Sequence, residues 1–253
     1  MRINITRIKS FITLLIIVSI SSCNIDRKIL YTHTEQIPFE NNKPFSFEKV
    51  TDPIVWRQFQ SLKEMQDACQ MPEIWLKKIS TENLVRTCIN YPLYGIYLAY
   101  NNELDGINVI MSGFNGFQEL IKREDAAKEI LNYYENTIIS CTKSHETVLS
   151  KVINPLRLGY IELIIASNGI PNLYHESHIK RLEDIARNAL ILKIQEPNVY
   201  SLNTIKYSLL IGAKAKLKSD TLSFSDQALL KKFIDNGGIT ESLHTITKIS
   251  NIL

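Results

Sequence analysis

The chain is short of the residues that mark several protein classes. Glycine and proline number 9 and 8 among 253 residues, and there are 4 cysteines. Collagen-like and low-complexity chains need far more glycine and proline, and disulfide-dense miniproteins need far more cysteine. Because 45% of the residues are hydrophobic, a wholly disordered chain is excluded as well. The composition predicts a real core, in one large domain or two small ones.

The chain also lacks an excess of charge outside its amino terminus. The formal net charge is +3, from 29 basic and 26 acidic residues. Arg2, Arg7 and Lys9 supply this excess, because no acidic residue occurs in 1–22. Binding that depends on phosphate neutralisation needs a basic face. A neutral remainder therefore makes a nucleic-acid partner unexpected.

No hydrophobic run is long enough for a permanent membrane-spanning helix. The longest apolar stretch near the amino terminus covers residues 11–20 (FITLLIIVSI), about half of the roughly 20 residues that a spanning helix needs. Three cations precede it and Ser21-Ser22-Cys23 follow it. This order is typical of a secretory signal peptide over residues 1–22.

The ending Ile20-Ser21-Ser22-Cys23 resembles a bacterial lipobox. The resemblance implies that Cys23 is the lipid attachment site, carrying palmitate-type chains, and the first residue of the mature protein. An uncleaved signal anchor, or a cleaved signal followed by a chance cysteine, is the alternative. No acidic run directly follows Cys23, which favours the periplasmic face of the outer membrane over export to the surface.

Residues 23–52 show neither helical nor strand periodicity and contain Pro38 and Pro44. We interpret them as a flexible tether to a single helical domain over residues 53–253. Beyond Pro53, apolar residues recur at spacings of three and four, as on one face of a helix. The three clearest stripes are Ile54, Val55, Phe59, Leu62, Met65 and Cys69; Leu84, Val85, Cys88 and Ile89; and Ile179, Leu182, Ile185, Ala186, Ala189 and Leu190.

Helix punctuation agrees with this pattern. Pro53, Pro72, Pro92 and Pro155 each stand where a helical run is predicted to begin. Asn115 and Gln118 resemble a capping box, and Asn236-Gly237-Gly238 is typical of a helix end. The predicted helices lie near 53–69, 72–79, 81–90, 92–100, 103–112, 115–135, 142–153, 156–167, 177–194, 200–217, 225–236 and 240–251.

The fold class expected from these runs is all-α, with about ten to twelve helices. No convincing alternating strand occurs, and residues 159–165 (GYIELII) fit a buried helix better than a strand. Short turns between helices favour an irregular antiparallel α-hairpin bundle or a short α-α superhelix. No repeat of fixed period is found.

His175 and His178 form the most suggestive metal-binding pair. Their spacing of three residues can place both on one helix face, with Glu183 or Asp184 one or two turns later. The zincin motif, however, needs a spacing of four. The alternative is a polar turn whose histidines face solvent, and no metal or other cofactor is expected.

The cysteines beyond Cys23 also have two interpretations. Cys141 lies four residues from His145, beside Glu146, and a thiol with an imidazole can form a nucleophile pair. The same face is otherwise apolar, which favours a buried cysteine. Cys69 and Cys88 are interpreted as reduced core residues, although a bridge between them remains an alternative.

Tyr91, Tyr94, Tyr97 and Tyr100 recur at every third residue, next to amide and carboxylate side chains. Aromatic rings beside polar groups suit a protein-binding or glycan-binding surface. Because a three-residue period drifts around an α-helix, half of these tyrosines are expected to pack inward. The sequence contains no glycine-rich phosphate loop, nucleophile elbow, paired-cysteine metal knuckle or calcium loop.

Residues 80–135 contain a TC-x-NYPL stretch, an FNGFQEL turn and a following helix with DA. This segment resembles a family of uncharacterised lipoproteins of Bacteroides-type bacteria. The resemblance covers under a quarter of the chain, implies an envelope location and an all-α fold, and carries over no catalytic residue.

The functional hypothesis is a non-enzymatic lipoprotein of the cell envelope. It would be held to the membrane through Cys23 and would bind a protein partner or another ligand as a scaffold module. The alternatives are a metal-assisted hydrolase built on His175 and His178, and a glycan-binding lipoprotein.

Overall fold

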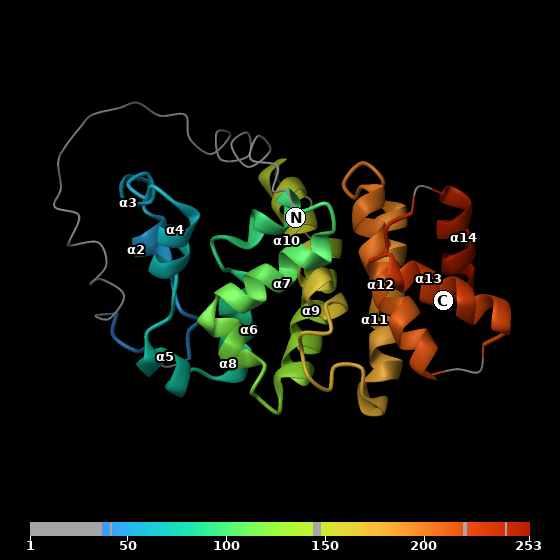
Figure 1. Cartoon of the computed structure of the whole chain (residues 1–253), viewed down its shortest axis with the longest axis horizontal. Helices are drawn as coiled ribbons and strands as arrows, with labels where there is room; N and C mark the ends of the chain where they lie inside the picture. Colours follow the sequence, from blue (N-terminus) through green and yellow to red (C-terminus); the bar gives the residue numbers. More distant parts are fainter. Residues whose placement is uncertain (1–36, 41, 144–147, 220–221, 241) are drawn as a thin grey trace. The chain divides into compact units, whose positions relative to one another are not determined.

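A computed structural model describes residues 37–40, 42–143, 148–219, 222–240 and 242–253 (Figure 1). The predicted signal peptide and Cys23 lie outside the described residues, as do His145 and Glu146. Within them the fold is all-α, without a strand, as predicted. No helix of this described part is long and apolar enough to cross a membrane.

The chain divides into two compact units, Met1–Lys122 and Arg123–Leu253. The helices of unit 1 are α2 (Glu48–Thr51), α3 (Pro53–Trp56), α4 (Leu62–Ala68), α5 (Glu73–Lys78), α6 (Thr81–Ile89), the 3₁₀ helix η2 (Tyr94–Ala99), α7 (Glu103–Gly113) and α8 (Asn115–Leu120). Those of unit 2 are α9 (Ala126–Lys143), α10 (Val148–Ala166), α11 (Glu176–Gln195), α12 (Leu202–Ser219), α13 (Phe224–Asp235) and α14 (Leu243–Ile252). The single domain over 53–253 stays a prediction.

Aromatic side chains form the core of unit 1. Tyr91 and Phe114 stack with their ring centres 4.4 Å apart and their planes 19° apart. Phe47 lies against both of these rings, and Phe117 meets Phe114 edge-on at 6.0 Å. Such ring pairs add stabilisation beyond the burial of their area. The core therefore joins the segment before α2 to α6 and α8.

The amino-terminal part of unit 1 corrects the predicted tether. Phe45, Phe47 and Val50 are all buried, and the Phe45 backbone N–H donates to Thr87 Oγ1 at 2.9 Å. A flexible tether through residue 52 is therefore wrong for residues 45–52, and also for Ile37 and Phe39, which both contact Trp75. The sequence around Phe45 and Phe47 has the composition of a loop, so their burial was not predicted. It depends on partners that lie about 40 residues later in the chain, Thr87 and Tyr91.

Four hydrogen bonds fix the α4–α5 connection to the α7–α8 turn. Gln70 Nε2 donates to the Gly113 carbonyl at 3.0 Å, and Gln70 Oε1 accepts from the Asn115 backbone N–H at 2.9 Å. The Asn115 side chain accepts from the Met71 N–H at 2.9 Å and donates to the Met71 carbonyl at 2.8 Å. The predicted capping box at Asn115 is thus wrong, because its amide bonds a distant backbone instead.

In unit 2, two successive helical hairpins stack on each other. α11 and α12 lie side by side and antiparallel (Figure 1), since Lys193 contacts Thr204 while Glu183 contacts Ser219. α10 and α12 run parallel, because Glu162 contacts Ser208 and the later residue Ala166 contacts the later residue Lys214. α9 packs on both α10 and α11. Stacking of consecutive hairpins is the principle of α-α superhelices.

Several predicted helix limits change. The predicted helix over 53–69 is two helices, with Asp52 capping α3 and Ser61 capping α4. Ile54 and Leu62 are consequently exposed, not part of one buried stripe. Pro155 lies inside α10 and does not begin a helix. The helix end at Asn236 is confirmed, because Gly237 and Gly238 adopt φ of 63° and 76° after α13.

Gly106 allows α7 to pack closely on η2, which gives a test of this packing. A Cβ atom at position 106 would lie 2.5 Å from the Tyr97 Cα, so Gly106→Ala is expected to lower the free energy of unfolding by about 1–3 kcal/mol. Gly113→Ala, on the same helix, is the control, since its Cβ would meet only the flexible end of Gln66 at 3.3 Å. Urea unfolding measures both variants, and equal stability for the two would contradict this packing.

Candidate functional site

The cluster richest in chemical groups lies inside unit 2, around Glu162. This carboxylate and the Lys193 ammonium form an ion pair with both side chains 0% exposed. Tyr134 donates to Glu162 Oε1 at 2.8 Å and Ser208 at 2.6 Å, while Lys193 also donates to the Thr204 carbonyl. The groups come from α9, α10, α11 and α12.

Burial and pairing set the protonation of this cluster. Burial lowers the pKa of Lys193, and the adjoining Glu162 carboxylate opposes that shift. Burial, followed by the charge of Glu162, raises the pKa of Tyr134 far above its ordinary value. Tyr134 is therefore a neutral donor to Glu162. Because the side chains of the ion pair have no exposure, they cannot reach a substrate, and they serve to position the four helices.

The described cysteines are all reduced and buried. These are Cys69, Cys88 and Cys141. Burial raises the pKa of Cys69 to about 12 and also raises that of Cys88 and Cys141. Thiols of this kind are poor nucleophiles near neutral pH. The interpretation of Cys69 and Cys88 as reduced core residues agrees with the structure, and Cys141 is likewise buried at 2% exposure.

Lys214 is a partly buried amine with an altered pKa. Burial lowers its pKa to about 8. Its Nζ donates to the Ala166 carbonyl at the end of α10 and to Asn168 Oδ1 at 3.0 Å, and lies 5.9 Å from the Tyr174 ring centre. Cations at a helix carboxyl end satisfy free carbonyls and oppose the helix dipole. The contacts therefore make Lys214 a cap of α10.

The four tyrosines do not form one surface. Tyr91 and Tyr97 are 1% and 2% exposed, whereas Tyr94 and Tyr100 are partly exposed. The expectation that half of them pack inward is therefore confirmed. A ligand surface made from all four is wrong, because Tyr91 stacks on Phe114 and Tyr97 lies against Gly106.

The histidine pair lies at the start of α11. His175 is the N-cap residue, and its Nδ1 accepts from the Ser177 backbone N–H at 3.4 Å. Burial, with the charges of His175 and Arg181, lowers the pKa of His178. Asp184 pairs with Lys180 and Glu183 accepts from Ser219. Among the described residues, no three His, Cys, Asp or Glu side chains gather in a group that could hold a metal ion.

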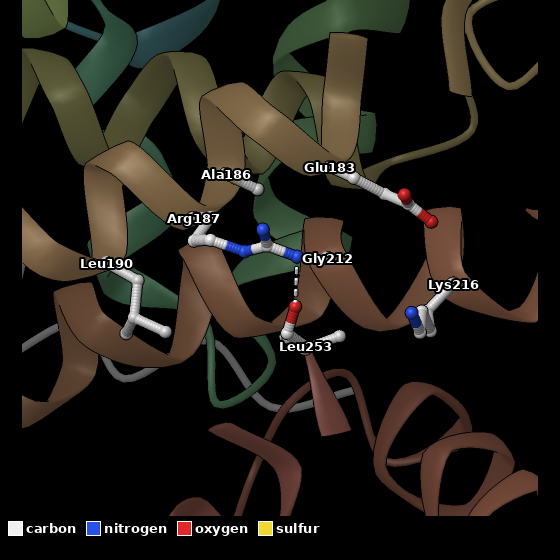
Figure 2. Close-up of a pocket in the computed structure, with 7 residues that line it drawn as sticks. All are labelled: Glu183, Ala186, Arg187, Leu190, Gly212, Lys216 and Leu253. Atoms are coloured by element: carbon white, nitrogen blue, oxygen red, sulfur yellow. Dashed lines mark hydrogen bonds between the residues drawn. The ribbon is translucent and has the colours of Figure 1, made fainter. Parts of the chain in front are cut away.

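A small pocket opens between α11, α12 and α14 (Figure 2). It has about 10 Å³ of space for a water-sized group, and its lining residues are Glu183, Ala186, Arg187, Leu190, Gly212, Lys216 and Leu253. Arg187 reaches across it and donates to the Leu253 carbonyl at 2.5 Å. A cavity needs about 10–15 Å³ of such space to hold one water molecule. This pocket thus has room for about one water molecule.

From this pocket, α11 continues into an exposed apolar face. Ile191 and Ile194 are 46% and 54% exposed, although the neighbouring Leu190 and Leu192 are buried. Arg187, Ile191 and Ile194 follow one another at spacings of four and three, so they lie on one side of the helix. We call these three residues the α11 face. Exposed apolar groups beside an arginine are the materials of a protein-binding surface.

Sequence reasoning missed the α11 face and the buried ion pair. The predicted stripe of α11 (Ile179, Leu182, Ile185, Ala186, Ala189 and Leu190) is buried throughout. Ile191 and Ile194 are the apolar residues that fall off that stripe, and this mismatch was the available signal. For the buried ion pair, the available signal was Glu162 itself, the single acidic residue within the apolar run 159–165.

Comparison with protein-family models, curated proteins and solved structures gives no match for this chain. The resemblance of residues 80–135 to a lipoprotein family therefore stays an expectation.

The buried ion pair can be tested by removing its cation. Lys193→Met would leave the Glu162 carboxylate buried and unpaired, so the free energy of unfolding should fall by about 3–5 kcal/mol. In Lys193→Met with Glu162→Gln, no buried charge remains, and part of that loss should be recovered. Urea unfolding of both variants measures this coupling. A loss under about 1 kcal/mol for Lys193→Met would contradict the positioning role.

Proposed function

We propose that this protein is a lipid-anchored lipoprotein of the cell envelope whose helical body binds a protein partner and performs no chemistry of its own. Residues 1–23 support the anchor, through a short apolar run between three cations and a lipobox-like cysteine. The proposed location is the outer membrane, with the body facing the periplasm. The neutral charge of the chain beyond residue 22 supports a partner other than nucleic acid.

The α11 face is the observation that carries the binding proposal. Its two isoleucines are about half exposed on a helix that the Glu162–Lys193 pair holds rigidly from behind. A rigid apolar strip costs little conformational entropy when a partner covers it. Arg187 at its edge keeps a guanidinium beside the apolar residues, as arginine commonly does in protein interfaces.

The described contacts favour neither alternative function. A hydrolase built on His175 and His178 would draw on Glu183 or Asp184, but these carboxylates bond Ser219 and Lys180. Glycan binding would draw on tyrosine rings, of which Tyr91 and Tyr97 are committed to the core. Protein binding through the α11 face is therefore the function that we propose.

Lipidation is tested by replacing its acceptor. Cys23→Ala removes the only thiol at the lipobox, so incorporation of labelled palmitate into the full-length chain should fall to background. Ser22→Ala, which keeps a small residue beside the cysteine, is the control and should label normally. Undiminished labelling of Cys23→Ala would defeat the anchor proposal.

The partner surface is tested in the native envelope. The double variant Ile191→Lys with Ile194→Lys places two cations on the α11 face without filling the core, and recovery of the crosslinked partner should drop about tenfold or more. Ile54→Lys is a matched control, since Ile54 is 68% exposed in the other unit. Equal recovery with the double variant and the control would refute the assignment of this face.

A further inference from the structure

The first described residues of the chain are held against α5. Trp75 Nε1 donates to the Ile37 carbonyl at 3.1 Å, and the Phe39 ring meets the Trp75 ring edge-on at 5.0 Å. Phe45 also meets the Trp75 ring edge-on, at 5.2 Å. Because Trp75 is 3% exposed, these contacts fix the position of Ile37 on the surface of α5.

The covalent distance from the proposed anchor to Ile37 is limited. Fourteen peptide bonds join Cys23 to Ile37, and they span at most about 50 Å in any arrangement. If Cys23 carries lipid, as the proposed function states, Ile37 must lie within that distance of the bilayer. The surface around Ile37 is thus confined near lipid headgroups at a high effective concentration.

That surface combines apolar groups with three lysines, two of which are paired with the exposed carboxylates of Glu73 and Glu40. On α5, Ile74 is 45% exposed and Lys77 has a 70% exposed side chain that pairs with Glu73. Lys78 is exposed, and its Nζ lies 5.8 Å from the Phe39 ring centre. Among the described residues Lys78 has no carboxylate partner. Nearby, Lys43 is neutralised by Glu40 at 2.7 Å.

We propose that Phe39, Ile74, Lys77 and Lys78 form a face that rests on the surface of the anchoring membrane and contacts its anionic lipid headgroups. Lysine side chains can lay their apolar stems along such a surface while the ammonium groups meet phosphate. An aromatic ring and an isoleucine beside them suit the interfacial zone. This inference rests on the proposed lipid anchor, which brings a weakly binding face to the bilayer.

Fluorescence quenching by spin-labelled lipid tests the inference on the full, lipidated chain in vesicles. Ile74→Cys carries an environment-sensitive fluorophore, and Ile54→Cys, also an exposed isoleucine of unit 1, is the matched control. The native cysteines among the described residues are buried, so a thiol-reactive fluorophore labels the introduced cysteine. In vesicles of phosphatidylethanolamine with phosphatidylglycerol, doxyl lipid should quench the position 74 probe about threefold more than the position 54 probe.

Charge reversal and labelling of the anchor complete the experiment. Lys77→Glu with Lys78→Glu, or vesicles of phosphatidylcholine alone, should remove most of the excess quenching at position 74. Equal quenching at the two positions, or an excess that persists in both of those conditions, overturns the headgroup contact. Palmitate labelling of the same samples separates the causes: absent label means that the anchor fails, whereas full label with equal quenching means that only this inference fails.

Discussion

The burial of a carboxylate and an ammonium in one apolar core is the constraint on which unit 2 depends. Two charges removed from water are costly unless each one is paired and hydrogen-bonded. Glu162 meets this demand only where Tyr134, Lys193 and Ser208 converge. A shift of one helix by a single turn would leave a charge unpaired. The cluster therefore selects one register for α9 to α12, beyond what apolar packing alone specifies.

Apolar periodicity predicted much of the helical architecture, because burial on one helix face is a local requirement of the sequence. It succeeded for residues 159–165, all seven of which are buried within α10. It failed between α3 and α4, where one apolar period continued across a break: α3 ends at Trp56, and α4 begins only after its capping residue Ser61. Pro155 misled the prediction for the opposite reason, since its helix continues through it.

The candidate sites were harder to predict, because exposure is set by distant partners. Tyr94 and Tyr97 share one 3₁₀ helix, in which residues three apart nearly eclipse each other, but the approach of Gly106 buries Tyr97. His175 resembled a ligand, yet its ring nitrogen caps α11. Ile191 is an apolar residue of a type usually found in the core. Only its place on the helix, away from the face that carries the buried Leu182 and Ala189, indicates that it is exposed.

A lipid anchor changes what a modest surface can accomplish. The α11 face offers two half-exposed isoleucines and an arginine, which is too little area for a stable complex between two freely diffusing proteins. Confinement to a membrane raises the effective concentration of any partner in the same envelope. In the proposed function the anchor would meet most of the entropy cost of bringing the molecules together, which is why we propose that so small a strip can bind a partner.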